Sequence, residues 1–162
     1  VEVADINITE PIRETLAELK SSADEKSITL AYEAYPKMEY VLADSDRVKE
    51  LLANFVSNAI KYTPSGGVVR FTAERKGDEL CMEVSDTGYG IPESQKARIF
   101  EKFFRADNVR EKDTEGTGLG LYIVKALAEK MGGQISFESV ENKGTAFYVV
   151  LPLSEMAKKS GA

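Results

Sequence analysis

The sequence predicts an α/β two-layer sandwich, in which helices pack against one β-sheet, and two observations support this. Segments with apolar residues every three or four positions alternate with segments whose apolar residues recur at every second position. The chain has 162 residues, of which 43% are apolar, and no long polar low-complexity tract. This length and composition fit one domain with a single core, and mixed helix and strand runs are typical of layered α/β architectures.

The first half of the chain is expected to hold two helices with short strands between them. The patterns predict helices over residues 9–25 and 46–62, and strands over residues 27–33 and 40–43 around a turn at Pro36. The apolar residues that predict the two helices are Ile12, Leu16 and Leu19 in the first, and Val48, Leu51, Leu52, Phe55, Val56 and Ala59 in the second. The second helix has the clearest pattern.

The second half is expected to be a β-meander interrupted by helices. Alternating segments predict four strands, over residues 68–75, 79–85, 134–140 and 145–151. Helical spacing predicts two helices, over residues 92–100 and 116–131, the second with Leu119, Ile123, Leu127 and Met131 on one side. The charged stretch 105–115 has no clear period and is expected to be a mobile loop, and residues 154–162 are expected to be a frayed tail.

Composition excludes several classes of function. The net charge of -6 argues against nucleic-acid binding, which depends on clustered Lys and Arg. The absence of His excludes a Ser-His-Asp triad, an HExxH zinc site and the catalytic loop of protein kinases. The single cysteine, Cys81, excludes an internal disulfide and is expected to be a buried strand residue. No stretch is apolar enough to span a bilayer, so we expect no membrane contact by these residues and a cytoplasmic location, which is compatible with a parent protein anchored in the cell membrane.

A polar stripe runs along the predicted helix 46–62. Glu50, Asn54, Asn58 and Lys61 follow one another at steps of four, four and three residues, so they share one side of the helix. Asn is a poor helix former, and two of them one turn apart suggest a shared ligand. An Asn carbonyl oxygen is a ligand that Mg²⁺ accepts beside waters and phosphates. A solvated polar face remains the alternative interpretation.

A carboxylate and two glycines follow the strand 79–85. The period of two places Asp86 on the inward row, where it needs donors from turn amides or from a ligand such as an adenine amino group. Gly88 and Gly90 would allow the backbone to approach a flat ring closely. A simple strand-ending turn is the alternative.

A glycine-rich segment opens the predicted helix 116–131, with the sequence Gly116-Thr117-Gly118-Leu119-Gly120-Leu121. Free backbone N–H groups and the positive end of the helix dipole favour an anion there, so the segment is a candidate phosphate cradle. Its spacing matches neither the P-loop nor the Rossmann turn, which argues against both of those nucleotide folds.

Four motifs together resemble a known family. Asn54-x3-Asn58, Asp86-x-Gly88-x-Gly90, Phe100-x2-Phe103-Phe104-Arg105 and the glycine-rich segment resemble the N, G1, F and G2 boxes of the sensor histidine kinase ATP-binding catalytic domain. Lys143-Gly144-Thr145 resembles its last glycine box. The resemblance covers residues 5–152 and implies the Bergerat fold, a mixed β-sheet of about five or more strands covered on one face by about three helices. The domain would span residues 1–153.

The resemblance implies a site for ATP and Mg²⁺. Asn58 would bind the metal, Lys61 and Arg105 would bring positive charge to the phosphates, and Asp86 would accept the adenine amino proton. The stretch 105–115 would be a lid, and the nearby aromatic residues are either core or an anchor for that lid. The residues implied to bind the nucleotide are Asn54, Asn58, Lys61, Tyr62, Asp86, Gly88, Gly90, Ile91, Phe104, Arg105, Gly116, Thr117, Gly118, Leu119, Gly120, Leu121 and Thr145. Those implied to assist the chemistry are Asn54, Lys61 and Arg105.

One position separates the subfamilies of this fold. Related ATPases carry a Glu one turn before the metal-binding Asn as a general base, and here Asn54 occupies that place. An amide does not take a proton from water, so transfer to another group is favoured over hydrolysis. The resemblance implies that the γ-phosphoryl passes to a histidine on a separate dimerisation domain, expected upstream of Val1, and then to the receiver domain of a response regulator. The alternatives are a Bergerat ATPase, an anti-sigma-like serine kinase, and a regulatory module without catalysis.

Overall fold

The protein is described by a computed structural model that covers residues 4–6, 9–34, 41–43, 45–102, 104, 106 and 120–152. In chain order the elements are β1 (Ala4–Ile6), α1 (Thr9–Glu25), β2 (Thr29–Ala34), β3 (Val41–Ala43), α2 (Ser45–Lys61), β4 (Val68–Lys76), β5 (Glu79–Asp86), the 3₁₀ helix η2 (Glu93–Arg98), α4 (Gly120–Lys130), β6 (Gln134–Val140) and β7 (Gly144–Pro152).

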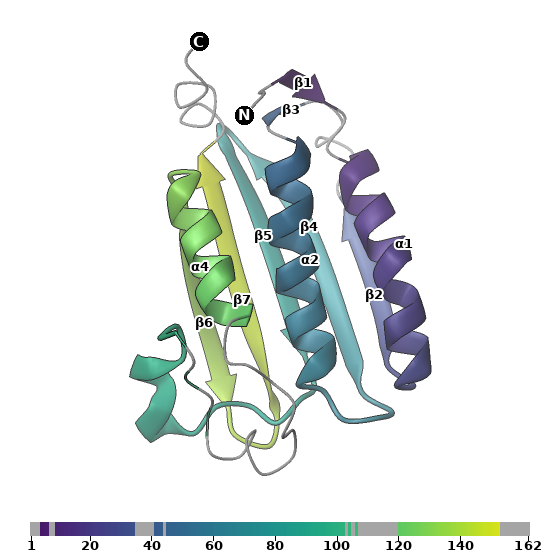
Figure 1. The fold of residues 1–162 in the computed structure, drawn as a ribbon, viewed down its shortest axis with the longest axis vertical. Coiled ribbons are helices and arrows are strands. Elements are labelled where there is room, and N and C mark those ends of the chain that lie inside the picture. Colours follow the sequence, from purple (N-terminus) through teal and green to yellow (C-terminus); the bar gives the residue numbers. More distant parts are fainter. Residues whose placement is uncertain are drawn as a thin grey trace.

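The main sheet has five strands in the order β2-β4-β5-β7-β6. Strands β2 and β4 are parallel, whereas the other three pairs are antiparallel, so the sheet is mixed. The helices α1, α2 and α4 all lie on one face of this sheet, with α2 in the middle (Figure 1). A separate two-stranded sheet pairs β1 with β3. The predicted two-layer sandwich with a mixed sheet and three helices on one face is confirmed.

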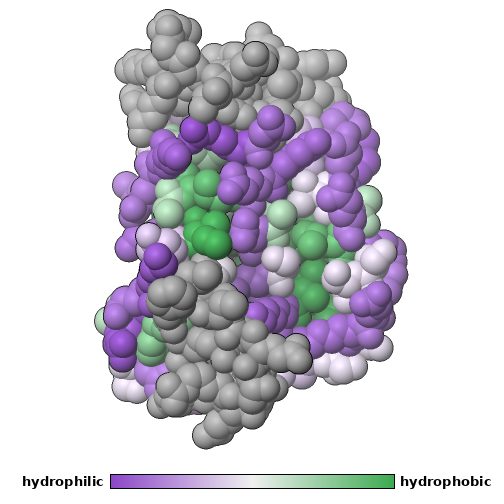
Figure 2. Space-filling view, viewed as in Figure 1, coloured by the Kyte–Doolittle hydropathy of each residue, from purple (hydrophilic) through white to green (hydrophobic). Residues whose placement is uncertain are grey.

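The core lies between the sheet and the three helices. All six apolar residues that predict α2 are buried, with at most 4% of any side chain exposed. They face the inward rows of β4, β5 and β7, which are Val69, Phe71, Ala73, Leu80, Met82, Val84, Phe147, Val149 and Leu151. Burial of each large apolar side chain contributes about 1.5–3 kcal/mol. On the outer surface of the helical face, hydrophobic residues gather in two separate areas among hydrophilic ones (Figure 2).

The end of α1 differs from the prediction. Ser27 has a φ of 59°, and Ile28 donates its N–H to the Ala23 carbonyl at 2.8 Å, so the turn closing the helix delays the strand until Thr29. The Lys26 ammonium donates to the carbonyls of Ile60 at 3.1 Å and Lys61 at 2.6 Å. Lys26 thus satisfies two carbonyls at the last turn of α2, where a cation is favoured.

Two other predicted helices differ in detail. The predicted helix 92–100 is a 3₁₀ helix over Glu93–Arg98, in which no residue is buried, whereas Ile99 directly after it belongs to the core. In α4 the most buried residues are Val124 and Ala128, while Ile123 and Leu127 are only half-buried. Helix α4 lies beside α2 and also packs against β6 and β7, and the apolar spacing alone did not identify Val124 and Ala128 as its most buried residues.

Cys81 is a strand residue as predicted, but it is half-buried, since alternation places it on the sheet face opposite Leu80 and Met82. Several predictions fall outside the described residues: the turn at Pro36, the loop 105–115 apart from Ala106, residues 116–119 and the tail 154–162. Among the described residues, no helix is long and apolar enough to cross a membrane.

Candidate functional site

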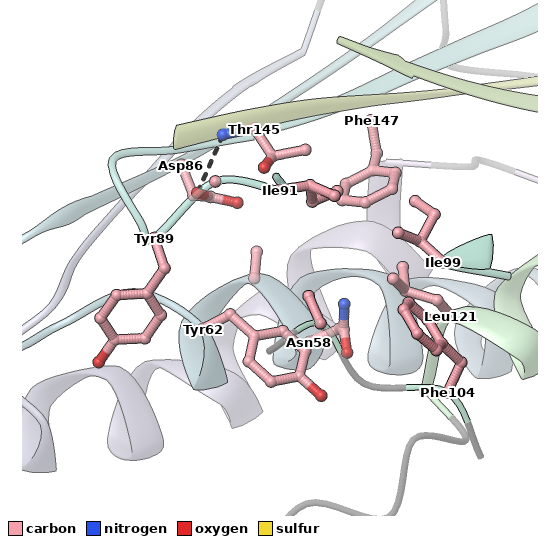
Figure 3. A pocket seen from close by; sticks show the side chains of 13 residues that line it. Asn58, Tyr62, Asp86, Tyr89, Ile91, Ile99, Phe104, Leu121, Thr145 and Phe147 are labelled. Carbon is pink, nitrogen blue, oxygen red and sulfur yellow. Dashed lines mark hydrogen bonds between the residues drawn. The ribbon is translucent and has the colours of Figure 1, made fainter. Parts of the chain in front are cut away.

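A pocket opens between the last turn of α2, the first turn of α4 and the end of β5 (Figure 3). Its empty volume, including the open mouth, is about 560 Å³. It is lined by Asn58, Ala59, Tyr62, Asp86, Tyr89, Gly90, Ile91, Ile99, Phe104, Ala106, Leu121, Thr145 and Phe147.

Asp86 supplies the only carboxylate among these residues. Its Oδ1 accepts hydrogen bonds from the backbone N–H of Gly88 at 2.8 Å and of Thr145 at 3.2 Å. Burial raises the pKa of Asp86 from 3.8 to about 6, although the two backbone donors act in the opposite direction. No described residue hydrogen-bonds to Oδ2, and the side chain points into the pocket (Figure 3). At neutral pH the pocket therefore offers an uncompensated negative acceptor.

The loop after Asp86 is fastened to the turn between β6 and β7. The Tyr89 carbonyl accepts from the Asn142 N–H at 2.7 Å, and the Ile91 N–H donates to Ser139 Oγ at 2.9 Å. Gly90 has a φ of +68°, and a Cβ added there would lie 2.2 Å from the Val140 carbonyl oxygen. These contacts hold Ile91 against the floor of the pocket.

The glycines of this loop serve a purpose that the sequence did not suggest. A Cβ at Gly88 would lie 2.3 Å from the Tyr62 carbonyl oxygen, and a Cβ at Gly90 would clash with the backbone of Val140. Both glycines therefore permit close contact between protein backbones. Gly90 also lines the pocket, whereas Gly88 does not.

The two asparagines of α2 have different surroundings. Asn58 lines the pocket with 8% of its surface exposed, and its carboxamide makes no hydrogen bond to any described residue. Its Oδ1 lies so close to Gly120, at the start of α4, that a Cβ there would be 2.6 Å away. Asn54 lies outside the pocket and donates its Nδ2 to the Glu50 carbonyl at 2.8 Å. The polar stripe therefore brings Asn58, and not Asn54, to the site.

Apolar side chains form one wall of the pocket, which suits a flat heterocycle. Phe147 also belongs to a cluster with Phe100 and Phe137, whose ring centroids lie 5.6–6.3 Å apart. The Arg98 guanidinium lies 4.5 Å from the centroid of the Phe104 ring, which lines the pocket. Of the aromatic motif, Phe100 and Phe104 are partly buried and pack against the core, Phe104 also lines the pocket, and Phe103 is outside the described residues.

The structure places the remaining predicted site residues as follows. Those that line the pocket are Asn58, Tyr62, Asp86, Gly90, Ile91, Phe104, Leu121 and Thr145. Lys61 does not line it, and its Nζ lies 5.6 Å from the centroid of the Tyr62 ring. Arg105, Gly116, Thr117, Gly118 and Leu119 lie outside the described residues. The predictions missed five lining residues, which are Ala59, Tyr89, Ile99, Ala106 and Phe147. Phe147 could have been predicted from the sequence, because it lies two positions after Thr145 on the same strand and so shares its face.

The fold and the pocket define a class of protein, a two-layer α/β domain with a pocket between the helical layer and one end of a mixed sheet. Residues 43–155 match the family model described as "Histidine kinase-, DNA gyrase B-, and HSP90-like ATPase". The chain belongs to this family, and the predicted Bergerat fold is confirmed.

Similar proteins are sensor histidine kinases. The chain is 41% identical to the sensor histidine kinase WalK of Bacillus subtilis over 118 residues, which cover 72% of this chain and 19% of WalK. It is 37% identical to the sensor-like histidine kinase SenX3 of Mycobacterium tuberculosis over 150 residues, or 93% of this chain and 36% of SenX3. The chain therefore spans between about a fifth and a third of these relatives.

Solved structures agree with this family. The catalytic domain of histidine kinase ThkA has a TM-score of 0.79 and 33% identity, covering 94% of this chain and 97% of that one. Full-length ShkA in complex with AMPPNP has a TM-score of 0.80 and 32% identity, covering 94% of this chain and 31% of ShkA. At such coverage the likeness includes all the elements around the pocket.

Proposed function

We propose that this chain is the ATP-binding catalytic domain of a two-component sensor histidine kinase. It holds Mg-ATP and presents the γ-phosphoryl group to a histidine on a separate dimerisation domain, for relay to the receiver domain of a response regulator. The observation that carries this proposal is the pocket in which the acceptor Asp86 and the carboxamide of Asn58 lie on opposite sides.

Asp86 binds the base in this proposal. Its Oδ1 is committed to two backbone donors, whereas Oδ2 is available to accept a proton from an amino group. The half-buried Tyr62 and the apolar side chains of Ile91 and Leu121 provide surfaces for the flat ring. A charge-assisted hydrogen bond of this kind contributes about 1.5–3 kcal/mol.

Asn58 is the residue that fits the magnesium ion. Its carboxamide lines the pocket without a hydrogen bond to any described residue, and its carbonyl oxygen belongs to the ligand class that Mg²⁺ accepts. The ion, when bound with ATP, neutralises charge on the phosphates. Lys61, Arg105 and the segment Gly116–Leu121 are expected to add donors and positive charge around those phosphates.

Asn54 favours transfer over hydrolysis. It lies one turn before Asn58, its amide nitrogen is held by the Glu50 carbonyl, and its remaining oxygen is not basic enough to activate water. The chain is therefore expected to bind ATP and to turn it over very slowly without its phosphoacceptor domain. The family also includes ATPases, so hydrolysis is the alternative that an experiment must exclude.

The similar proteins support the partners in this proposal. The chain matches WalK and SenX3, which are described as sensor histidine kinases. A structure of ThkA in complex with the response regulator protein TrrA matches with a TM-score of 0.72 and 29% identity. We infer that a response regulator receives the phosphoryl group in this system as well.

The test combines the chain with a helical dimerisation domain from a related kinase and ATP labelled at the γ-phosphate. We expect acid-labile label on that domain, and none when its acceptor histidine is replaced by Ala. A matched preparation carrying Asn58→Ala should transfer at least about tenfold more slowly. Rapid phosphate release without the partner would identify an ATPase instead, and acid-stable label would identify a serine kinase.

A further inference from the structure

Ser139 lies on β6, behind the base-binding end of the pocket, and it does not line the pocket. Its buried hydroxyl has three neighbours: the Ile91 N–H at 2.9 Å, the Gly144 carbonyl at 3.0 Å and Thr145 Oγ1 at 2.8 Å. Ser139 thus contacts both the loop after Asp86 and the start of β7, which carry the residues that meet the base.

The chemistry of these neighbours fixes the positions of the protons. A serine hydroxyl has one proton and two lone pairs. The Ile91 N–H can only donate, and the Gly144 carbonyl can only accept, so Ser139 gives its single proton to Gly144. Either oxygen could donate in the contact with Thr145, and the one arrangement that satisfies all three contacts at once makes Thr145 the donor. With these three bonds the hydroxyl of Ser139 is saturated.

This arrangement of protons determines how the hydroxyl group of Thr145 can interact with a ligand. Since its only hydroxyl proton points to Ser139, Thr145 Oγ1 presents lone pairs alone to the pocket. Asp86 Oδ2 also presents lone pairs alone, and Figure 3 shows both side chains directed into the same part of the pocket. This end of the pocket therefore contains two acceptors and, among the described residues, no side-chain donor.

We propose that Ser139 is a specificity-determining positioning residue, which holds Thr145 as an acceptor and so makes the pocket select a purine with an amino group over one with a carbonyl. This rests on the proposed function as an ATP-binding domain. The amino group of adenine has two protons for the two acceptors. The carbonyl oxygen of hypoxanthine has none and faces two lone-pair groups, which is the unsatisfied arrangement that discriminates strongly between ligands.

Replacement of Ser139 by Ala removes the partner of the Thr145 proton. Thr145 is then free to rotate and donate into the pocket, where it meets a carbonyl group favourably and an amino group unfavourably. The variant should therefore bind ATP more weakly and ITP more tightly than before. A purely structural role for Ser139 would weaken both nucleotides by the same factor.

The experiment measures the dissociation constants of Mg-ATP and Mg-ITP by competition with a fluorescent nucleotide. Because the phosphates and ribose are the same, the ITP-to-ATP ratio of the two constants reports only the base. The wild type should prefer ATP by about tenfold or more, and Ser139→Ala should reduce this ratio by about three- to tenfold. The same substitution in a Thr145→Val background should leave the ratio unchanged, because no hydroxyl remains to reorient.

The outcomes separate this inference from the proposed function. A wild-type chain that binds neither nucleotide overturns both. A wild-type chain that prefers ATP, together with a Ser139→Ala ratio equal to that of the wild type, overturns the role of Ser139 alone. If Ser139→Ala changes the ratio equally in the wild-type and Thr145→Val backgrounds, the inference is also overturned, since Ser139 would then act through packing.

Discussion

Replacement of Asp86 by Asn should weaken nucleotide binding and at the same time stabilise the fold. The amide keeps an oxygen to accept from the N–H groups of Gly88 and Thr145, so the loop geometry is preserved. Its nitrogen replaces Oδ2, however, and turns the acceptor that meets the base into a donor. Loss of a charge-assisted bond of about 1.5–3 kcal/mol weakens ATP affinity by roughly 10- to 100-fold.

The stability of the same variant should change in the opposite direction. Burial raises the pKa of Asp86 from 3.8 to about 6, so the folded state holds the proton more tightly than the unfolded state does. The contribution of Asp86 is therefore most favourable below pH 4 and is lost as the pH rises through about 6. At 1.36 kcal/mol per pKa unit, the ionised group destabilises the fold at pH 7 by up to about 3 kcal/mol. Part of this cost remains in the variant, because an amide is also costly to bury. We therefore expect Asp86→Asn to raise the free energy of unfolding at pH 7 by about 1 kcal/mol.

Two measurements test this reasoning. Titration calorimetry with Mg-ATP gives the affinity, and urea unfolding at pH 7 gives the free energy of unfolding. Asp78→Asn, the same chemical change at an exposed turn at the opposite end of β5, should alter neither quantity. Unchanged ATP affinity in Asp86→Asn would refute the role of Oδ2. Affinity and stability falling together would show that the loss comes from a damaged fold.

Three further results are expected. The affinity of the wild type for ATP should fall as the pH decreases through about 6, because protonated Asp86 no longer offers a negative acceptor. The phosphates of ATP also titrate in this range, so Asp86→Asn measured in parallel gives the pH dependence that is due to the phosphates alone. Asn58→Ala should remove about tenfold or more of the gain in ATP affinity that Mg²⁺ provides, measured with and without MgCl₂, while an equal gain in variant and wild type would exclude Asn58 as a ligand. Gly144→Ala should lower the unfolding free energy by at least about 2–3 kcal/mol, since its φ is +134° and its Cβ would lie 2.0 Å from the Asp86 carbonyl oxygen; Gly77→Ala, with a φ of +59° and open space, should lose only about 1 kcal/mol in the same urea assay.

The sequence was sufficient where local spacing determines the outcome. The apolar residues of α2 are buried as predicted, because a helix with one apolar side has only one way to face a sheet. The expectation for Asp86, that it needs turn amides or a ligand donor, is met for one of its oxygens by two backbone amides. The role of the other oxygen remains a prediction.

The sequence was insufficient for features of the site that depend on contacts between segments far apart in the chain. Asn54 and Asn58 belong to one stripe, and only the position of Gly120 on α4 shows that Asn58 faces the pocket. Ser139 gave no signal at all, because its hydroxyl acts on Ile91, a residue 48 positions away. The 3₁₀ conformation of η2 was not predicted either, since the residues Glu93–Arg98 carry no pattern that distinguishes a 3₁₀ helix from an α-helix.

The fastening of the loop after Asp86 has a consequence for how the domain folds. The bonds from Thr145 to Asp86 and from Ile91 to Ser139 join residues 59 and 48 positions apart, so neither can form until β5, β7 and β6 have paired. Contacts of such long range are closed late and at a large entropic cost. Under the proposed function, a partly folded chain therefore has no site for the base, and ATP would bind only to the complete sheet. At a concentration one hundred times its dissociation constant, the nucleotide would stabilise the folded state by about 2.7 kcal/mol. Binding would therefore shift the equilibrium from partly folded chains towards the complete fold.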